Sequence, residues 1–186
     1  MKILAIVGSP RLRGNTNYLV DEALKEAAKL GAQTEKIMLT KHRLNPCRGH
    51  DGCASFTSCR QKDDGVWILD KFCEADGVIL ATPVYYYNVS AQMKVFIDRN
   101  YFLYKHDRKC GARAVGIIVV AEQEGIKDTL HTLRRFIDSS LEVTEDGIFI
   151  ASGYASKAGD ARKNPSLAEE ARRLGRKMVA KLQEMG

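Results

Sequence analysis

The segment that decides the fold is KILAIVGSPRLRGNT, residues 2–16. Its apolar half, residues 2–7, is typical of a buried strand, and its polar half is followed by the pattern of an amphipathic helix. A loop between a strand and a helix presents unpaired backbone N–H groups and the positive end of the helix dipole. Ser9, Asn15 and Thr16 add side-chain donors, and Arg11 adds a positive charge. The segment therefore predicts a site for a phosphorylated ligand.

The spacing of the two loop glycines excludes the two commonest phosphate loops. Gly8 and Gly14 are separated by five residues, whereas a P-loop needs four, and Asn15 stands where a P-loop has its lysine. Ser9 and Pro10 break the Gly-x-Gly-x-x-Gly pattern of dinucleotide-binding loops. A loop richer in hydroxyl and amide donors than in glycine suits a terminal monophosphate. An ordinary strand-to-helix turn is the alternative without a ligand.

Length and composition favour a single domain, residues 1–186, in which 45% of the residues are hydrophobic. No apolar run approaches the roughly 20 residues of a membrane span, and no secretory leader is evident, so we expect a cytoplasmic protein without membrane contact. The net charge of +6 comes largely from the last helix. We interpret that helix as a solvated face, because no nucleic-acid-reading motif accompanies it.

Strand and helix patterns alternate along the chain. Nearly continuous apolar runs predict parallel strands at 2–7, 34–39, 77–81, 114–120 and 148–151. Helical spacing of apolar residues predicts helices around 19–28, 64–72, 126–137 and 167–182. The last helix is expected to begin at Pro165, with a capping box formed by Ser166 and Glu169. This alternation predicts an α/β, flavodoxin-like three-layer sandwich with a five-stranded parallel sheet of order 2-1-3-4-5. Ligands of such sheets bind beyond the carboxyl ends of the strands, where the first and third strands diverge.

Three consecutive tyrosines follow the third predicted strand, in the loop of residues 82–90. Tyr85, Tyr86 and Tyr87 would have to satisfy three hydroxyls in a buried strand. At the rim of a site they offer flat faces to a planar ring while their hydroxyls reach water. A tyrosine-rich surface turn or a contact between subunits is the alternative.

The two loops together resemble the NADPH-dependent FMN reductase family, and most closely its iron–sulfur flavoprotein branch. The resemblance rests on GSPR and GNT in residues 8–16, and on PVYY, VSAQMK and FIDR in residues 83–99. It implies a flavodoxin-like fold that binds FMN, in a homodimer or homotetramer. The phosphate ligands implied are Ser9, Arg11, Asn15 and Thr16. The residues implied around the flavin ring are Pro83, Val84, Tyr85, Tyr86, Asn88, Ala121 and Glu122. Relatives have more glycine in the loop of Glu122 and Glu124.

A cysteine-rich loop, residues 40–63, follows the second predicted strand. Cys47, Cys53 and Cys59 match the compact four-cysteine motif of the iron–sulfur flavoproteins, and His50 stands at the second cysteine. Three alternatives follow: an iron–sulfur cluster with one histidine ligand, a zinc site, or a metal-free pocket in which His50 contacts flavin or substrate. Five cysteines are an odd number, and clustered cysteines in a cytosolic protein indicate metal or redox chemistry before disulfides. Of the other two, Cys73 is expected in the core, and Cys110 has no predicted role.

The sequence thus predicts an oxidoreductase in which bound FMN carries the chemistry and no side chain needs to be catalytic. Electrons would come from NAD(P)H or from a redox protein, and pass to a small molecule or a second redox protein. One alternative is an iron–sulfur flavoprotein that transfers electrons from ferredoxin-like donors through a second redox centre. Another is a non-enzymatic redox or metal sensor.

Overall fold

A parallel sheet forms the middle layer of the computed structural model, which describes residues 1–184. Its strand order is β2-β1-β3-β5-β6. The strands are β1 (Lys2–Val7), β2 (Gln33–Met38), β3 (Gly77–Tyr85), β5 (Ala114–Ala121) and β6 (Ile148–Tyr154). The predicted flavodoxin-like order is therefore confirmed. A short sixth strand, β4 (Asn88–Val89), pairs antiparallel with the end of β3.

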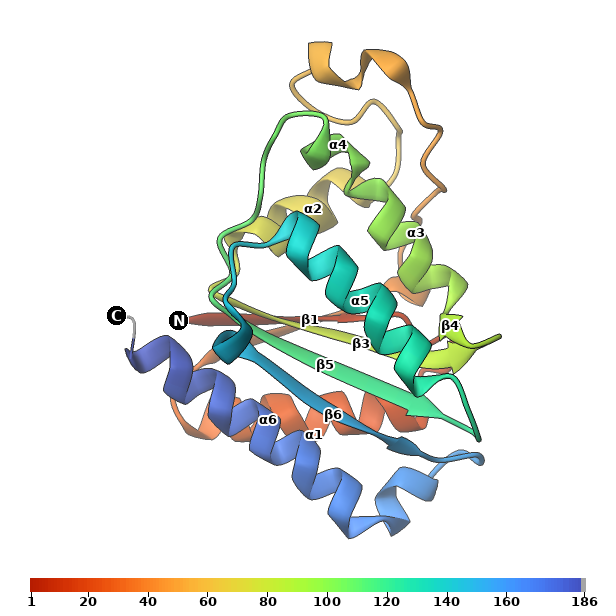
Figure 1. Cartoon of the computed structure of the whole chain (residues 1–186), viewed down its shortest axis with the longest axis vertical. Helices are drawn as coiled ribbons and strands as arrows, with labels where there is room; N and C mark the ends of the chain where they lie inside the picture. Colours follow the sequence, from red (N-terminus) through yellow and green to blue (C-terminus); the bar gives the residue numbers. More distant parts are fainter. Residues whose placement is uncertain (185–186) are drawn as a thin grey trace.

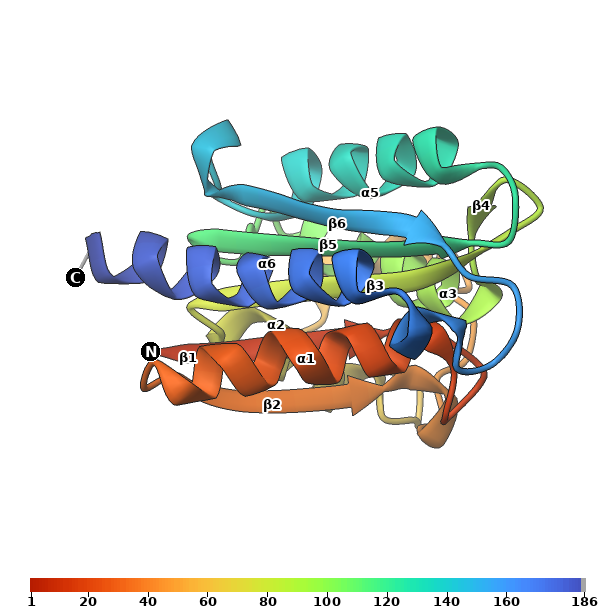
Figure 2. The same cartoon turned by 90° about the horizontal axis from the view of Figure 1, so that it is seen from below.

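Helices cover both faces of the sheet, so the three predicted layers are present (Figures 1 and 2). One face packs against α1 (Asn15–Lys29) and α6 (Pro165–Glu184). The other face is covered by α2 (Gly65–Glu74), α3 (Ala91–Arg99), α4 (Tyr101–Tyr104) and α5 (Ile126–Ser140). The apolar stripe predicted for α6 is buried, and so is the one predicted for α1 except at Ala28, which is exposed. A Cβ at Gly175 would lie 2.2 Å from the Ala23 carbonyl oxygen, so this glycine allows α1 and α6 to touch.

Several local predictions need correction. The third strand continues past residue 81 to Tyr85, because Thr82 and Pro83 still pair with β5 and the next residues pair with β4. The capping box is wrong: Asn164 Oδ1 accepts the Leu167 N–H at 3.1 Å, and Asn164 thus caps the helix that begins at Pro165. Proline suits the first helical position because it has no N–H to satisfy there, which leaves the residue before it as the cap.

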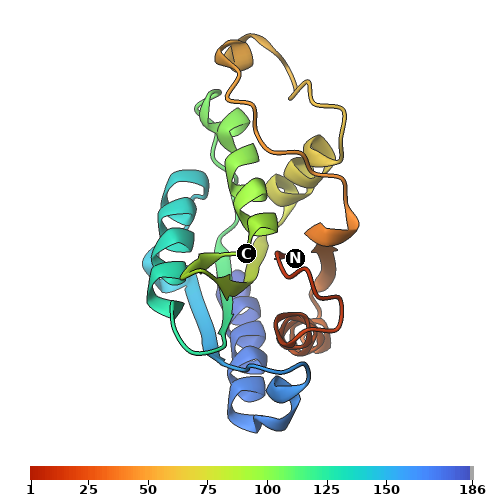
Figure 3. The same ribbon diagram turned by 90° about the vertical axis from the view of Figure 1, so that its right-hand side faces the viewer.

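The cysteine-rich loop extends beyond the sheet, at the top of Figures 1 and 3. It contains two short 3-10 turns, Leu39–Lys41 and Asp51–Ser55, and leads into α2. Cys73 and Cys110 form a disulfide with 4.5 Å between their Cα atoms, a pairing that was not predicted from the sequence. Among residues 1–184, no helix is both long and apolar enough to cross a bilayer.

Candidate functional site

Four loops meet at the carboxyl ends of the parallel strands, which point to the right in Figure 1 and toward the viewer in Figure 3. They are residues 8–14 after β1, the β3–β4 hairpin, residues 122–125 after β5 and residues 155–161 after β6. The loops that carry the predicted FMN residues therefore lie at one edge of the sheet, as expected for a parallel α/β fold.

The loop after β1 leaves the start of α1 open to an anion. The first backbone bond of this helix runs from the Tyr18 N–H to the Gly14 carbonyl oxygen at 3.1 Å, so the N–H groups of residues 15–17 have no intrahelical acceptor. Gly14 is the N-cap and has no side chain to occupy them. Ser9 Oγ accepts the Arg11 N–H at 3.2 Å and is nearly buried, whereas the Arg11 side chain is exposed. Thr16 is only 2% exposed. This arrangement fits a phosphate group.

The side chain of Asn15 has a different role from the predicted one. Its Nδ2 donates to the carbonyl oxygens of Ala155 and Lys157 at 3.3 and 2.9 Å. Its Oδ1 accepts the N–H groups of Gly159 and Ala161 at 3.0 and 3.2 Å. All of its hydrogen-bonding capacity is thereby used to hold residues 155–161 against the start of α1. Only its backbone N–H remains for a phosphate.

Ser90 joins the phosphate loop to the β3–β4 hairpin. Its Oγ donates to the Gly8 carbonyl oxygen at 2.5 Å and accepts the Met93 N–H at 3.2 Å, which caps α3. Thr82 Oγ1 accepts the Ser90 N–H at 3.0 Å. A Cβ at Gly8 would lie 2.6 Å from Met93 Cβ, so the loop can pass here only with glycine. These supporting roles were not predicted from the sequence, although a serine three residues before the buried Met93 is a pattern typical of a helix N-cap.

The tyrosine hairpin projects from this edge. Tyr86 and Tyr87 have φ values of 48° and 63°, a left-handed conformation that two-residue hairpin turns normally give to asparagine and glycine. Tyr86 is 99% exposed. A Cβ at Gly125 would lie 2.7 Å from Tyr87 Cα, so the loop after β5 packs directly on the hairpin. Backbone strain of this kind concentrates at functional sites.

The remaining predicted ring contacts lie on these same loops. Pro83 and Val84 are half-buried in β3, and Asn88 Oδ1 accepts the Val89 N–H at 2.8 Å. The Ala121 carbonyl oxygen accepts the Ala155 N–H at 2.9 Å, and Glu122 Oε1 accepts the Ser156 hydroxyl at 2.8 Å. The structure thus gathers these residues at one edge, and their contacts with FMN stay a prediction.

A cavity of about 410 Å³ lies within the cysteine-rich loop, where it meets Phe102 beyond the end of α3. Its walls carry the three predicted cysteines, histidine, two phenylalanines and four basic side chains: Cys47, Cys53, Cys59, His50, Phe56, Phe102, Arg43, Arg48, Arg60 and Lys62. Burial raises the pKa of the Cys53 thiol, and the nearby Cys59 and Cys47 raise it further. Within residues 1–184, no three His, Cys, Asp or Glu side chains are close enough to hold a single metal ion. The predicted ligands therefore share one cavity without forming a ready zinc site.

His50 is engaged inside the loop. Its Nδ1 accepts the Gly52 N–H at 3.1 Å. In a neutral imidazole the proton then resides on Nε2, which leaves neither nitrogen with a free lone pair. A ligand role for His50, which stays a prediction, requires this bond to break.

Arg99, the last residue of α3, attaches the loop to this helix, a role that was not predicted from the sequence. Its Nη1 donates to Asp63 Oδ2 at 2.5 Å and to the Asn45 carbonyl oxygen at 3.0 Å, and its Nη2 donates to Cys59 Sγ at 3.4 Å. The two charged side chains are 1% and 0% exposed. Burial opposes both charges, but the bond between them outweighs it, raising the pKa of Arg99 and lowering that of Asp63. A Cβ at Gly65 would lie 2.4 Å from Nη2, so glycine makes room for the guanidinium.

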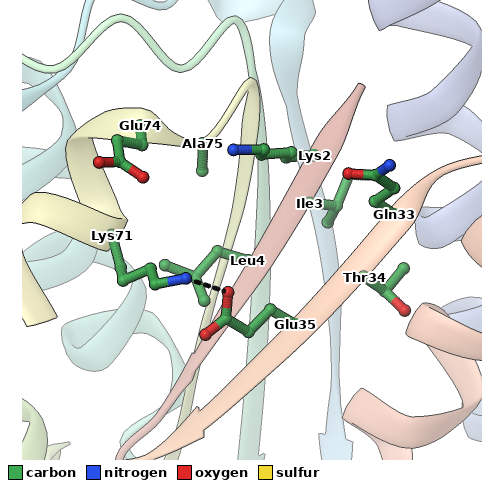
Figure 4. A pocket seen from close by; sticks show the side chains of 9 residues that line it. All are labelled: Lys2, Ile3, Leu4, Gln33, Thr34, Glu35, Lys71, Glu74 and Ala75. Carbon is green, nitrogen blue, oxygen red and sulfur yellow. Dashed lines mark hydrogen bonds and ion pairs between the residues drawn. The ribbon is translucent and has the colours of Figure 1, made fainter.

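Another cavity, of about 360 Å³, lies between α2 and the first residues of β1 and β2 (Figure 4). Lys71 and Glu35 form an ion pair across it at 3.1 Å, and Lys2 and Glu74 also line it. Because it opens near the amino ends of these strands, it is remote from the four loops at their carboxyl ends.

Comparisons with known proteins agree with this geometry. Residues 1–156 match the family model described as NADPH-dependent FMN reductase. An iron-sulfur flavoprotein of Methanocaldococcus jannaschii is 39% identical over 187 residues, which cover 96% of this chain and 96% of that protein. An iron-sulfur flavoprotein of Archaeoglobus fulgidus is 46% identical over 99 residues, which cover 53% of this chain and 45% of that protein. A solved NAD(P)H:quinone oxidoreductase from Methanothermobacter marburgensis has a TM-score of 0.73 at 16% identity, covering 95% of this chain and 96% of that one. This last similarity concerns the fold alone.

Proposed function

Because this chain belongs to the NADPH-dependent FMN reductase family and is an FMN-dependent oxidoreductase, we propose that its FMN lies across the four loops, with NAD(P)H as the donor of electrons. The phosphate would be held at the start of α1, by the free N–H groups of residues 15–17 and by Ser9, Arg11 and Thr16. The open helix start is the observation that carries this placement, because a buried helix end without partners calls for a ligand.

The other loops would border the flavin ring. Pro83, Val84, Tyr85, Tyr86 and Asn88 of the hairpin would form one side, and Ala121 and Glu122 another. Bound FMN supplies the chemistry, since its ring accepts a hydride or single electrons. The chain binds the phosphate, orients the ring and excludes water from it.

A flavin titration tests this proposal. We expect the purified protein to retain FMN, and anaerobic addition of NADPH or NADH to bleach the flavin absorbance in a saturable reaction. Failure to bind FMN on reconstitution would overturn the assignment of the site. Binding of FMN without bleaching by either nucleotide would overturn NAD(P)H as the donor.

A second candidate function is favoured by the cysteine cavity. We propose that Cys47, Cys53 and Cys59 hold an iron–sulfur cluster and that electrons reach the protein from a ferredoxin-like donor. Three thiols on one cavity fit this group, because thiolates are the usual cluster ligands, and the surrounding basic side chains offset its negative charge. The relative that is 39% identical over nearly the whole chain is itself named an iron-sulfur flavoprotein.

Metal analysis separates the two candidates. Protein purified without oxygen is examined for iron, acid-labile sulfide, zinc and flavin, and then mixed with reduced ferredoxin or with NADPH. Iron and sulfide together with flavin support the cluster, and a faster reaction with ferredoxin supports the electron-transfer function. Flavin without iron would exclude the cluster and support the NAD(P)H-dependent reductase.

We also propose a cytoplasmic homodimer or homotetramer built from this single domain. The support is aromatic surface: Tyr86, Tyr104 and Tyr154 are all well exposed. Light scattering after size-exclusion chromatography would measure the mass, and a monomer of 20.7 kDa would refute the oligomer.

A further inference from the structure

The guanidinium of Arg99 holds both ends of the cysteine-rich loop. On the incoming side it bonds the Asn45 carbonyl oxygen, two residues before Cys47. On the outgoing side it bonds Asp63 and the sulfur of Cys59. Asp63 Oδ2 in turn accepts the Asn45 N–H at 2.8 Å, and its Oδ1 accepts the Gly65 N–H at 2.9 Å. The buried Arg99–Asp63 pair is therefore hydrogen-bonded to two residues that line the cavity, Asn45 and Cys59.

Of the three cavity thiols, Cys59 is the one whose sulfur receives an N–H from a buried cation. Cys47 Sγ instead accepts the Gly49 backbone N–H at 3.4 Å. The Arg99–Cys59 bond connects the cavity wall to α3, whose N-cap Ser90 is bonded to Gly8 at the other end. The nine residues of α3 span about 13 Å along the helix axis between the Ser90 cap and Arg99.

We propose that Arg99 is a positioning residue of the second redox centre, which aims the Cys59 sulfur into the cavity and donates an N–H to it in the loaded protein. This inference rests on the proposed cluster. A hydrogen bond to a ligating sulfur stabilises the more negative, reduced state, so the bond raises the reduction potential of the centre. Asp63 already balances the charge of Arg99, which leaves the N–H to sulfur bond as the distinctive contribution of the arginine.

The test is Arg99→Lys in the anaerobically purified holoprotein. Lysine keeps the positive charge beside Asp63 but lacks the planar fork that reaches Asn45, Asp63 and Cys59 together. We expect FMN content equal to that of the wild type, together with fewer iron atoms per chain or a more negative cluster potential, followed by spectroscopic redox titration. A tenfold weaker preference for the reduced state corresponds to about 59 mV for a one-electron couple.

Two further variants make the result specific. Arg60→Lys is the matched control, because Arg60 lines the same cavity and stacks on Phe56 with 4.5 Å from its Cζ to the ring centre. Gly65→Ala displaces the guanidinium without changing Arg99 and should reproduce the effect of Arg99→Lys.

Each outcome decides the matter. Wild-type protein without iron refutes the proposed cluster and this inference with it. A loaded wild type with unchanged occupancy and potential in Arg99→Lys refutes the inference alone, as does an equal shift in Arg60→Lys. If Arg99→Lys and Gly65→Ala both lose FMN as well as iron, Arg99 supports the whole fold and the specific role is rejected.

Discussion

Replacing Asn15 by alanine should release residues 155–161 from the start of α1. The change removes four hydrogen bonds of 2.9 to 3.3 Å and leaves their backbone partners to water or unpaired. At a net value of about 0.5–1.5 kcal/mol for each bond, and with part of the loop open to water, we expect a loss of about 3 kcal/mol. For a chain of 186 residues this lowers the melting temperature by roughly 6–12 °C.

The same variant separates a structural role of Asn15 from a direct one. Because all hydrogen bonds of the Asn15 side chain go to residues 155–161, Asn15→Ala should weaken the binding of FMN and of riboflavin by similar factors. The preference for the phosphorylated flavin should therefore stay unchanged. Urea unfolding of the flavin-free protein and fluorescence titration with both flavins measure the two effects.

Asn17→Ala is the matched control, because the Asn17 side chain bonds the Leu12 carbonyl oxygen and Lys36 nearer the surface. We expect it to lose less than about 1 kcal/mol. The structural role of Asn15 is refuted if Asn15→Ala unfolds like the control, or if the variant loses tenfold or more of the preference for FMN over riboflavin.

Four other outcomes are expected. Thr16→Val should weaken the binding of FMN at least about tenfold, which is the value of one hydrogen bond to a charged phosphate, and should leave the binding of riboflavin as in the wild type. An equal loss of affinity for both flavins would exclude a phosphate contact of Thr16. Gly8→Ala should lower the free energy of unfolding by about 1–3 kcal/mol through overlap with Met93, and Gly111→Ala, where a Cβ meets nothing within 4 Å, should not. The pKa of Asp63 is lowered in the folded protein, so its carboxylate stabilises the fold at pH values above the ordinary carboxyl pKa, and this contribution is lost as the pH falls below about 4. Asp63→Asn should lower the free energy of unfolding by about 3–5 kcal/mol at neutral pH. In urea unfolding at several pH values, the variant should also lose the part of the acid dependence that Asp63 contributes. If the protein holds the proposed cluster, His50→Ala should keep the iron content of the wild type, because His50 Nδ1 is occupied by the Gly52 N–H, whereas loss of iron on metal analysis would identify His50 as a ligand.

The sheet could be predicted from the sequence because buried parallel strands have nearly continuous apolar runs, as in Lys2–Val7. The site edge followed from topology, since the carboxyl ends of neighbouring parallel strands meet. The end of β3 could not be placed, because Thr82 and Pro83 are typical loop residues and only their pairing with β5 keeps them extended.

Contacts between residues that are distant in the sequence could not be predicted from local patterns. Asn15 is a good phosphate donor by composition, yet its bonds reach residues about 140 positions away, which no local pattern encodes. The Arg99–Asp63 pair and the Cys73–Cys110 disulfide likewise join segments 36 and 37 residues apart. The sequence located the cysteine cavity but not the arginine that anchors it.

The left-handed turn at Tyr86 and Tyr87 has a consequence for engineering. Asparagine followed by glycine is the pair that such a turn prefers, so this substitution should stiffen the hairpin, by on the order of 1 kcal/mol or more. It would also remove two aromatic rings from the rim where the flavin is expected. A screen that ranked variants by thermal stability alone would therefore select a more stable protein that lacks these two aromatic rings. Tyr86 and Tyr87 should be kept unchanged in such a screen.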